Sequence, residues 1–210
     1  MLFFDLDGTL TDPKEGITAS IQYALRGLGE TSIPHQDELT WCIGPPLRGS
    51  FVQMLDADRA DEAVTLYREH FATTGLFQNR VYGGIDTLLR SLRAQNRQLC
   101  VASSKPRVYV EQILRHFSLD HYFAQVFGSE LDGTRADKGE LLSYALAQTG
   151  SAAADSVMIG DRQHDVHGAA LNQMDCIGVL YGYGSRDELT DAGAKHLVDN
   201  PAQLLQLLTR

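Results

Sequence analysis

Two aspartates near the start of the chain have the types and spacing of an acid pair or a metal site. Asp5 and Asp7 follow the apolar run 1–4, and Gly8 comes directly after them. An apolar run that ends in Asp and Gly is typical of a buried strand that ends in a turn. Because open α/β sheets bind ligands at the carboxyl ends of their strands, we expect both carboxylates at such an edge. A simple turn is the alternative, since Asp and Gly are common turn residues.

Three later segments also place polar side chains just beyond a predicted strand or at the start of a helix. Ser103 and Ser104 end a strand, and their hydroxyls could hold a phosphate oxygen. Lys138 begins a helix, where a cation opposes the helix dipole, so we expect an anionic partner for it; a solvated surface lysine is the alternative. Asp161 and Asp165 lie four residues apart, one after a strand and one in the next helix. A turn followed by a helix cap would explain that pair equally well.

We expect Asp5, Asp161 and Asp165 to meet at the ends of neighbouring strands. Two like charges about 4 Å apart repel by roughly 4 kcal/mol at an effective dielectric constant near 20. Three such acids therefore need cations, or they must take up protons. Magnesium suits a site of carboxylate oxygens that keeps some waters and accepts a substrate phosphate oxygen. With Lys138 as a second, fixed positive charge, the site would attract a phosphate dianion.

The composition is that of a folded, acidic protein. Of the 210 residues 43% are hydrophobic and 21% are charged, which allows a proper core and argues against disorder. The formal net charge of −9 argues against non-specific nucleic-acid binding, which depends on Lys and Arg. No apolar run has membrane-spanning length, and no secretory signal is visible. Three widely spaced cysteines outside any metal pattern suit a reduced, cytoplasmic protein.

Strands and helices alternate from residue 83 onward, which predicts a parallel sheet with helices on both faces. Further strands are expected at 99–102, 126–127, 157–159 and 176–180. Residues 13–79 carry only helical patterns, and Asp12 is the expected N-cap of the first of these helices, with Pro13 at its first position. We therefore predict an α/β fold with two parts. A Rossmann-like, doubly wound parallel-sheet core takes residues 1–12 and 80–210, and an all-helical cap inserted after the first strand takes residues 13–79.

In order and type, the four polar segments resemble the four motifs of the haloacid dehalogenase-like hydrolases. Residues 5–9 (Asp-Leu-Asp-Gly-Thr) resemble the first motif, Ser103 the second, Lys138 the third, and residues 160–165 the fourth. The helical insert is similar to the small cap of that family. Residues 44–47 (Gly-Pro-Pro-Leu), 104–106 (Ser-Lys-Pro) and 181–184 (Tyr-Gly-Tyr-Gly) are similar to marks of its phosphoglycolate phosphatase-like branch.

The resemblance implies a mechanism. Asp5 would attack phosphorus and form an aspartyl-phosphate, while Asp7 would first protonate the leaving oxygen and then activate water. Ser103 and Lys138 would hold the transferring phosphoryl group. Mg²⁺ would be bound by the carboxylates of Asp5 and Asp161, by the backbone carbonyl of Asp7, and by Asp165 either directly or through a water.

Arg48, in the predicted cap, is the candidate for contact with an anionic substrate tail. The planar fork of an arginine suits a carboxylate or a phosphate. A place on a solvated helix face is the alternative for this side chain.

These expectations combine into a magnesium-dependent phosphatase of small phosphomonoesters, of the phosphoglycolate or nucleoside 5'-monophosphate type. A sugar-phosphate mutase is disfavoured, because such mutases usually carry a Glu-Asp pair where this chain has Gly160 and Asp161. A pyrophosphatase and a non-catalytic phosphate-binding regulatory protein on the same fold are further alternatives. The expected partner is a small phosphorylated metabolite, with no nucleic acid and no membrane, and the expected assembly is a monomer or a weak homodimer.

Overall fold

The computed structural model describes residues 1–209, and these form two compact units. One unit combines Met1–Asp12 with the chain from Val81 onward, and the other is Pro13–Arg80. The second unit thus ends one residue beyond the predicted insert. Its action as a cap stays a prediction.

The first unit is built on a parallel sheet with the strand order β5-β4-β1-β6-β7-β8. Its strands are β1 (Leu2–Phe4), β4 (Leu99–Pro106), β5 (Gln125–Ser129), β6 (Val157–Gly160), β7 (Asp175–Val179) and β8 (His196–Val198). The short strand β1 is central, with Phe4 in register with Val101 of β4 and with Ile159 of β6. A central strand is buried on both faces, which explains why β1 is wholly apolar. The carboxyl ends of β4, β1 and β6 therefore lie next to one another.

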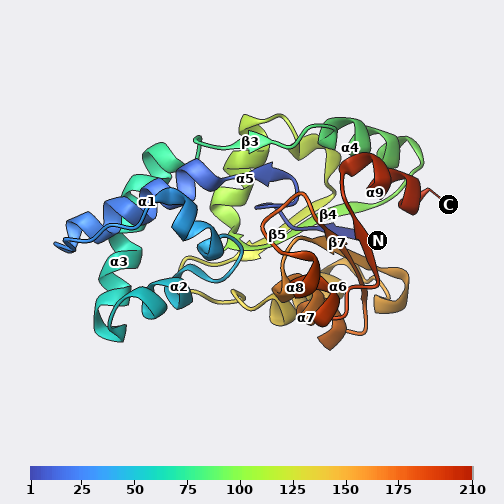
Figure 1. Cartoon of the computed structure of the whole chain (residues 1–210). Coiled ribbons are helices and arrows are strands. Elements are labelled where there is room, and N and C mark those ends of the chain that lie inside the picture. The colour runs from blue at the N-terminus through green and yellow to red at the C-terminus, as the bar shows by residue number, and fades with distance from the viewer. Residues whose placement is uncertain (210) are drawn as a thin grey trace. The chain divides into compact units, whose positions relative to one another are not determined.

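Helices cover both faces of this sheet, as the doubly wound prediction requires. They are α4 (Ile85–Ala94), α5 (Arg107–His116), α6 (Lys138–Thr149), α7 (Gln163–Leu171), α8 (Arg186–Asp191) and α9 (Pro201–Leu208), with the short turns η3 (Asp120–Tyr122) and η4 (Ala153–Asp155). Figure 1 shows α4 and α9 on one side of the sheet and α6, α7 and α8 on the other. Phe3 and Met158 pack with Leu141 of α6 and Val166 of α7 in one buried cluster. Because side chains alternate along a strand, Leu2 and Phe4 face the opposite layer.

The second unit is helical. It contains α1 (Lys14–Gly27), η1 (Gln36–Cys42), α2 (Leu47–Met54), α3 (Ala57–His70) and η2 (Phe71–Gly75). Its core includes Phe51, Tyr67 and Phe71; the last two rings stack with centroids 5.2 Å apart. Two short strands, β2 (Thr11–Asp12) and β3 (Arg80–Val81), pair where the chain passes between the units.

Two helix starts differ in how they are capped, and the second of them corrects a prediction. Asp137 caps α6, since its carboxylate accepts a hydrogen bond from the backbone N–H of Glu140. Asp12 does not cap α1: the N-cap is Pro13, and no side chain within residues 1–209 makes a capping hydrogen bond there. Asp12 lies in β2 instead, where its carboxylate accepts a hydrogen bond from the hydroxyl of Tyr183. A partner 171 residues away in sequence is a tertiary contact that local spacing does not reveal.

No helix within residues 1–209 combines the length and the apolar character that a membrane crossing needs.

Candidate active site

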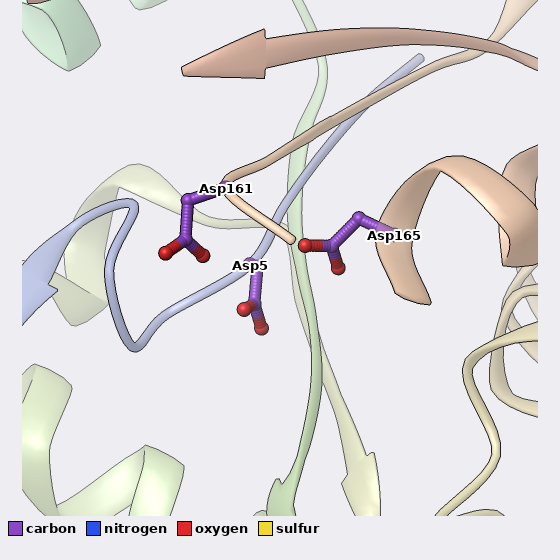
Figure 2. Close-up of side chains that lie close together, drawn as sticks. All are labelled: Asp5, Asp161 and Asp165. Atoms are coloured by element: carbon purple, nitrogen blue, oxygen red, sulfur yellow. The ribbon is translucent and has the colours of Figure 1, made fainter. Parts of the chain in front are cut away.

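Three carboxylates converge at the carboxyl edge of the sheet. Asp5 follows β1, Asp161 follows β6, and Asp165 lies in the first turn of α7. One oxygen from each carboxylate lies within 4.8 Å of the other two. Figure 2 shows the three side chains directed toward a common space. All three are buried, so the arrangement concentrates negative charge away from water.

Asp165 combines the two roles that the sequence left open. It stands at the third position of α7, and its Oδ2 accepts a hydrogen bond of 3.1 Å from the backbone N–H of Arg162. It is therefore a helix-capping residue and a member of the acidic cluster at once. Gly160 makes this position accessible, because a Cβ at residue 160 would overlap the carboxylate of Asp165.

Lys138 is the fixed cation of the cluster. Its Nζ lies 3.1 Å from Oδ1 of Asp5 and 2.8 Å from Oδ1 of Asp165. The same nitrogen donates a hydrogen bond of 2.9 Å to the carbonyl of Ala102. Lys138 is buried, so the alternative of a solvated surface lysine is wrong. Its two carboxylate partners outweigh the unfavourable helix dipole, whose effect is typically about 0.3–1 kcal/mol.

The charges in this cluster do not balance, because one lysine faces three acids. Burial raises the pKa of Asp161 well above its usual range, and the neighbouring Asp165 and Asp5 raise it further. Burial also raises the pKa of Asp165, while Lys138 opposes that change. For Lys138 itself, burial favours a lower pKa, but the carboxylates of Asp165 and Asp5 raise it. The site is therefore short of positive charge.

The donor set fits a hard divalent cation. All three candidate ligands are carboxylates, and oxygen ligands are what Mg²⁺ and Ca²⁺ prefer. Within the described residues, the buried Oδ1 of Asp161 has no hydrogen-bond partner, as expected of an atom that a metal would satisfy. Oxygens that share one Mg²⁺ at about 2.1 Å lie at most about 4.2 Å apart. The 4.8 Å within which the oxygens of Asp5, Asp161 and Asp165 lie is close to that size.

The backbone around Asp161 fixes its carboxylate. The backbone N–H of Tyr183 donates a hydrogen bond of 2.7 Å to Oδ2 of Asp161. Gly8 and Gly182 leave room for this side chain, because a Cβ at either position would overlap it. Gly8 also has a φ of +81°, in the region that favours glycine. The predicted turn after Asp7 thus needs glycine for two separate reasons.

Asp7 is paired with Lys105, which belongs to the Ser-Lys-Pro segment that resembles the phosphoglycolate phosphatase-like branch. Nζ of Lys105 lies 2.5 Å from Oδ2 of Asp7, and the two side chains are 7% and 9% exposed. Burial raises the pKa of Asp7, and the ammonium of Lys105 opposes that change. One signal in the sequence could have identified Lys105. It lies two residues after Ser103, at the edge of the sheet where several aspartates are predicted to lie, and a lysine there can pair with one of them.

The remaining predicted site residues differ in their surroundings. Ser103 is buried near the end of β4, and its hydroxyl oxygen accepts a hydrogen bond of 3.4 Å from the backbone N–H of Lys105. Ser104 is partly exposed, and its carbonyl accepts a hydrogen bond of 2.8 Å from the hydroxyl of Ser129. The roles of both serines in phosphate binding stay predictions.

Arg48 lies in α2 of the second unit, and its side chain is 58% exposed. Its guanidinium makes a two-point contact with Asp61, at 2.6 Å from Nε to Oδ1 and 3.2 Å from a terminal nitrogen to Oδ2. Asp61 therefore occupies the side of the planar Arg48 guanidinium that was predicted to contact an anionic substrate tail. Contact with substrate stays a prediction, and it would require Arg48 to exchange Asp61 for the ligand.

The close fit around Gly8 leads to a prediction on stability. An alanine in the left-handed region costs roughly 1–2 kcal/mol, and overlap in a packed site adds typically 1–3 kcal/mol. We expect Gly8→Ala to bear both costs, because its Cβ would meet the carboxylate of Asp161. Urea denaturation should therefore show a loss of about 3 kcal/mol in the free energy of unfolding.

Gly133 provides a matched control for this variant. Its φ is +92°, and a Cβ there meets no atom of the described residues within 4 Å. Gly133→Ala should thus show only the backbone cost. Equal losses for the two variants would contradict the crowding assigned to Gly8.

Comparison with known proteins places this geometry in a family context. A family model described as haloacid dehalogenase-like hydrolase matches residues 2–179. A 5'-nucleotidase from Pseudomonas aeruginosa is 50% identical over 209 residues, which cover 99% of this chain and 94% of that protein. The tyrosine-protein kinase PtkA from Mycobacterium tuberculosis is 39% identical over 187 residues, covering 89% of this chain and 64% of the kinase. A phosphoglycolate phosphatase from Colwellia psychrerythraea is 26% identical, with 100% of this chain and 97% of that protein covered.

The fold is also similar to a solved structure. A predicted phosphatase from Clostridium acetobutylicum superposes with a TM-score of 0.96 at 42% sequence identity. The superposition covers 99% of this chain and 97% of the other. The α/β architecture and the family predicted from the four motifs are thereby confirmed.

Proposed function

The chain belongs to the haloacid dehalogenase-like hydrolases, and on that premise we propose a magnesium-dependent phosphatase that acts through an aspartyl-phosphate. Its relatives make it a phosphatase of this family; the ion, the intermediate and the substrate are our proposal. One observation carries the proposal most directly. The acids Asp5, Asp161 and Asp165 gather around one space beside a buried lysine.

Magnesium held by Asp5, Asp161, Asp165 and the backbone carbonyl of Asp7 would supply the missing positive charge and neutralise a bound phosphate. Lys138 would stabilise the phosphoryl oxygens from a fixed position, because both Asp5 and Asp165 hold its ammonium. Ser103, buried at the same edge of the sheet, would add a hydroxyl donor. Positioning and cations of this kind are the main means of catalysis in phosphoryl transfer.

The acids would share the chemical work. Asp5 would attack phosphorus in line with the leaving group, which divides one hard step into two easier ones. Asp7 would protonate the leaving oxygen and then remove a proton from the attacking water. Lys138 contacts Oδ1 of Asp5 at 3.1 Å, which favours Oδ2 as the attacking oxygen.

Nucleoside 5'-monophosphates are the first substrate class to consider, because the relative at 50% identity over 99% of the chain is a 5'-nucleotidase. Phosphoglycolate comes second, on the strength of the relative at 26% identity. A sugar-phosphate mutase is further disfavoured by the crowding at residue 160. A Glu there would need a Cβ where the carboxylate of Asp165 lies.

Phosphate release from a panel of phosphomonoesters, with Mg²⁺ or with EDTA, tests this proposal. We expect nucleoside monophosphates or phosphoglycolate to release phosphate fastest among the esters of the panel, and we expect EDTA to abolish turnover. Ligand binding at 100 times the dissociation constant stabilises a protein by about 2.7 kcal/mol. Mg²⁺ should therefore raise the melting temperature of the wild-type protein and have little effect on Asp161→Asn.

Two results would contradict the proposal. Turnover that is unchanged in EDTA would remove magnesium from the mechanism. Phosphate transfer from ATP to a tyrosine peptide, without hydrolysis of any monoester in the panel, would instead assign the chain to the activity named for its kinase relative.

A further inference from the structure

The strand β4 contains an irregularity beside the active site. It extends beyond the predicted end at Ala102 and runs to Pro106. Its register with β5 shifts between Ser103, which lies opposite Gly128, and Pro106, which lies opposite Ser129, so two extra residues of β4 are inserted there. Extra residues of this kind bend a strand and redirect side chains, and they are common next to active sites.

The neighbouring strand is built to accept this bulge. A Cβ at Gly128 of β5 would lie 2.6 Å from Cα of Arg107 and 2.8 Å from the carbonyl oxygen of Lys105. Only glycine therefore lets the bulged backbone approach so closely. The hydroxyl of Ser129 adds a hydrogen bond of 2.8 Å to the carbonyl of Ser104. Both contacts hold the main chain on either side of Lys105.

The bulge presents Lys105 to Asp7. The ammonium donates a hydrogen bond of 2.5 Å to Oδ2 of Asp7, and both side chains are almost fully buried. Buried charges are stable only when they are paired with good geometry, so this contact fixes the orientation of the carboxyl group. The other oxygen of Asp7, Oδ1, is also buried and has no hydrogen-bond partner within residues 1–209.

We propose that Lys105 is a positioning residue that occupies Oδ2 of Asp7 and so leaves Oδ1 as the oxygen that exchanges protons with the substrate. This inference rests on the proposed phosphatase function. In the first half-reaction a bond forms between Asp5 and phosphorus as the bond to the leaving oxygen breaks. That oxygen takes the proton carried on Oδ1 of Asp7, and the alcohol departs.

In the second half-reaction, water attacks the phosphorus of the aspartyl-phosphate. The water gives a proton to Oδ1 of Asp7, the bond between Asp5 and phosphorus breaks, and inorganic phosphate leaves. Both aspartates return to their starting states, so the cycle consumes only water and the ester. Throughout, Lys105 acts on the substrate only through Asp7.

A comparison of leaving groups tests the role of Lys105. General acid–base catalysis contributes about 10²–10⁴-fold to a rate, and it matters most for alkoxides, which are poor leaving groups. We expect Lys105→Met to lower kcat/KM for an alkyl phosphomonoester by about 100-fold. For p-nitrophenyl phosphate, whose leaving group needs no proton, kcat/KM should fall less than about 5-fold. The ratio kcat/KM is used because it reports the steps up to departure of the alcohol.

Asp7→Asn completes a double-mutant cycle with Lys105→Met, because the effects of substituting two residues that act as one unit do not add. Adding Lys105→Met to Asp7→Asn should cause no further loss of kcat/KM on the alkyl ester. Lys195→Met is the matched control, because Lys195 also pairs with a carboxylate at 2.5 Å, that of Asp175, but its side chain is 55% exposed. Its kinetics should equal those of the wild-type protein.

Equal losses on the two esters, or an additive loss in the double variant, would overturn the proposal and make Lys105 a direct ligand of the phosphate. If Lys105→Met does not fold, Lys105→Arg carries the test, because it keeps the charge but changes the donor geometry. It should lower kcat/KM for the alkyl ester by about 10-fold and leave the aryl ester nearly unchanged; unchanged kinetics on both would overturn the proposal. A wild-type protein that hydrolyses neither ester would instead refute the phosphatase function itself.

Discussion

The Asp5→Asn variant is expected to release phosphate at least about 10⁴-fold more slowly than the wild-type protein, since loss of a catalytic nucleophile has effects of that order. An amide cannot form the aspartyl-phosphate, and it is also a weaker ligand for a divalent cation. The fold should persist, because Lys138 keeps its contact with Asp165. The measurement is kcat at saturating Mg²⁺ on the best substrate of the panel, together with the melting temperature.

Loss of turnover alone would not separate a lost nucleophile from a lost metal ligand. Acid quenching of the wild-type protein during turnover makes this distinction, because the acyl phosphate can be located by mass spectrometry on the peptide that contains Asp5. Asp191→Asn, at the exposed end of α8, is the control and should behave as the wild-type protein does. Turnover of Asp5→Asn near the wild-type rate, or a phosphoryl group on another residue, would refute covalent catalysis at Asp5.

Lys138→Met is expected to have the largest effect on stability. It removes a lysine that is paired with both Asp5 and Asp165, and breaking a buried ion pair by removal of one partner costs about 3–5 kcal/mol. Urea denaturation at pH 7 in EDTA should therefore show a loss of about that size in the free energy of unfolding. Turnover should fall as well, because the phosphoryl group would lose its fixed cation.

Lys195→Met again provides the comparison, since an exposed ion pair contributes roughly 0–1 kcal/mol. Addition of Mg²⁺ should restore part of the stability of Lys138→Met. It should stabilise the control Lys195→Met less than it stabilises Lys138→Met, and about as much as it stabilises the wild-type protein. A loss below about 1 kcal/mol for Lys138→Met would indicate that the buried acids take up protons instead of bearing unpaired charge. That result would contradict the electrostatic account of the site.

Local patterns were enough to predict the frame of the site. A wholly apolar run before Asp5 predicted a buried strand, and the structure makes that strand, β1, central in the sheet. The alternation of strands and helices required parallel pairing, because parallel strands need crossover connections. Parallel pairing in turn places the carboxyl ends of all the strands at one edge of the sheet, so the sequence predicts that Asp5 and Asp161 share that edge. The structure supplies the strand order, in which β1 and β6 are neighbours.

Contacts between distant residues were not predictable in this way. Asp12 fits the local pattern of a helix cap, but the hydroxyl of Tyr183 binds its carboxylate instead. Arg48 fits the pattern of a substrate contact, but in the structure its guanidinium meets Asp61. In both cases the side chain has several possible partners of similar strength. Which of them lies within reach depends on how the chain packs.

The order of residues along this chain determined the elements, their direction and the acids at their ends, because hydrophobic periodicity and turn chemistry act over a few residues. Only the tertiary structure decided which charges are paired inside the site. Lys105 reaches Asp7 because β4 bulges, and the bulge depends on a glycine in the adjacent strand β5. Burial then makes that pairing necessary, because a buried charge without an oppositely charged partner would strongly destabilise the fold.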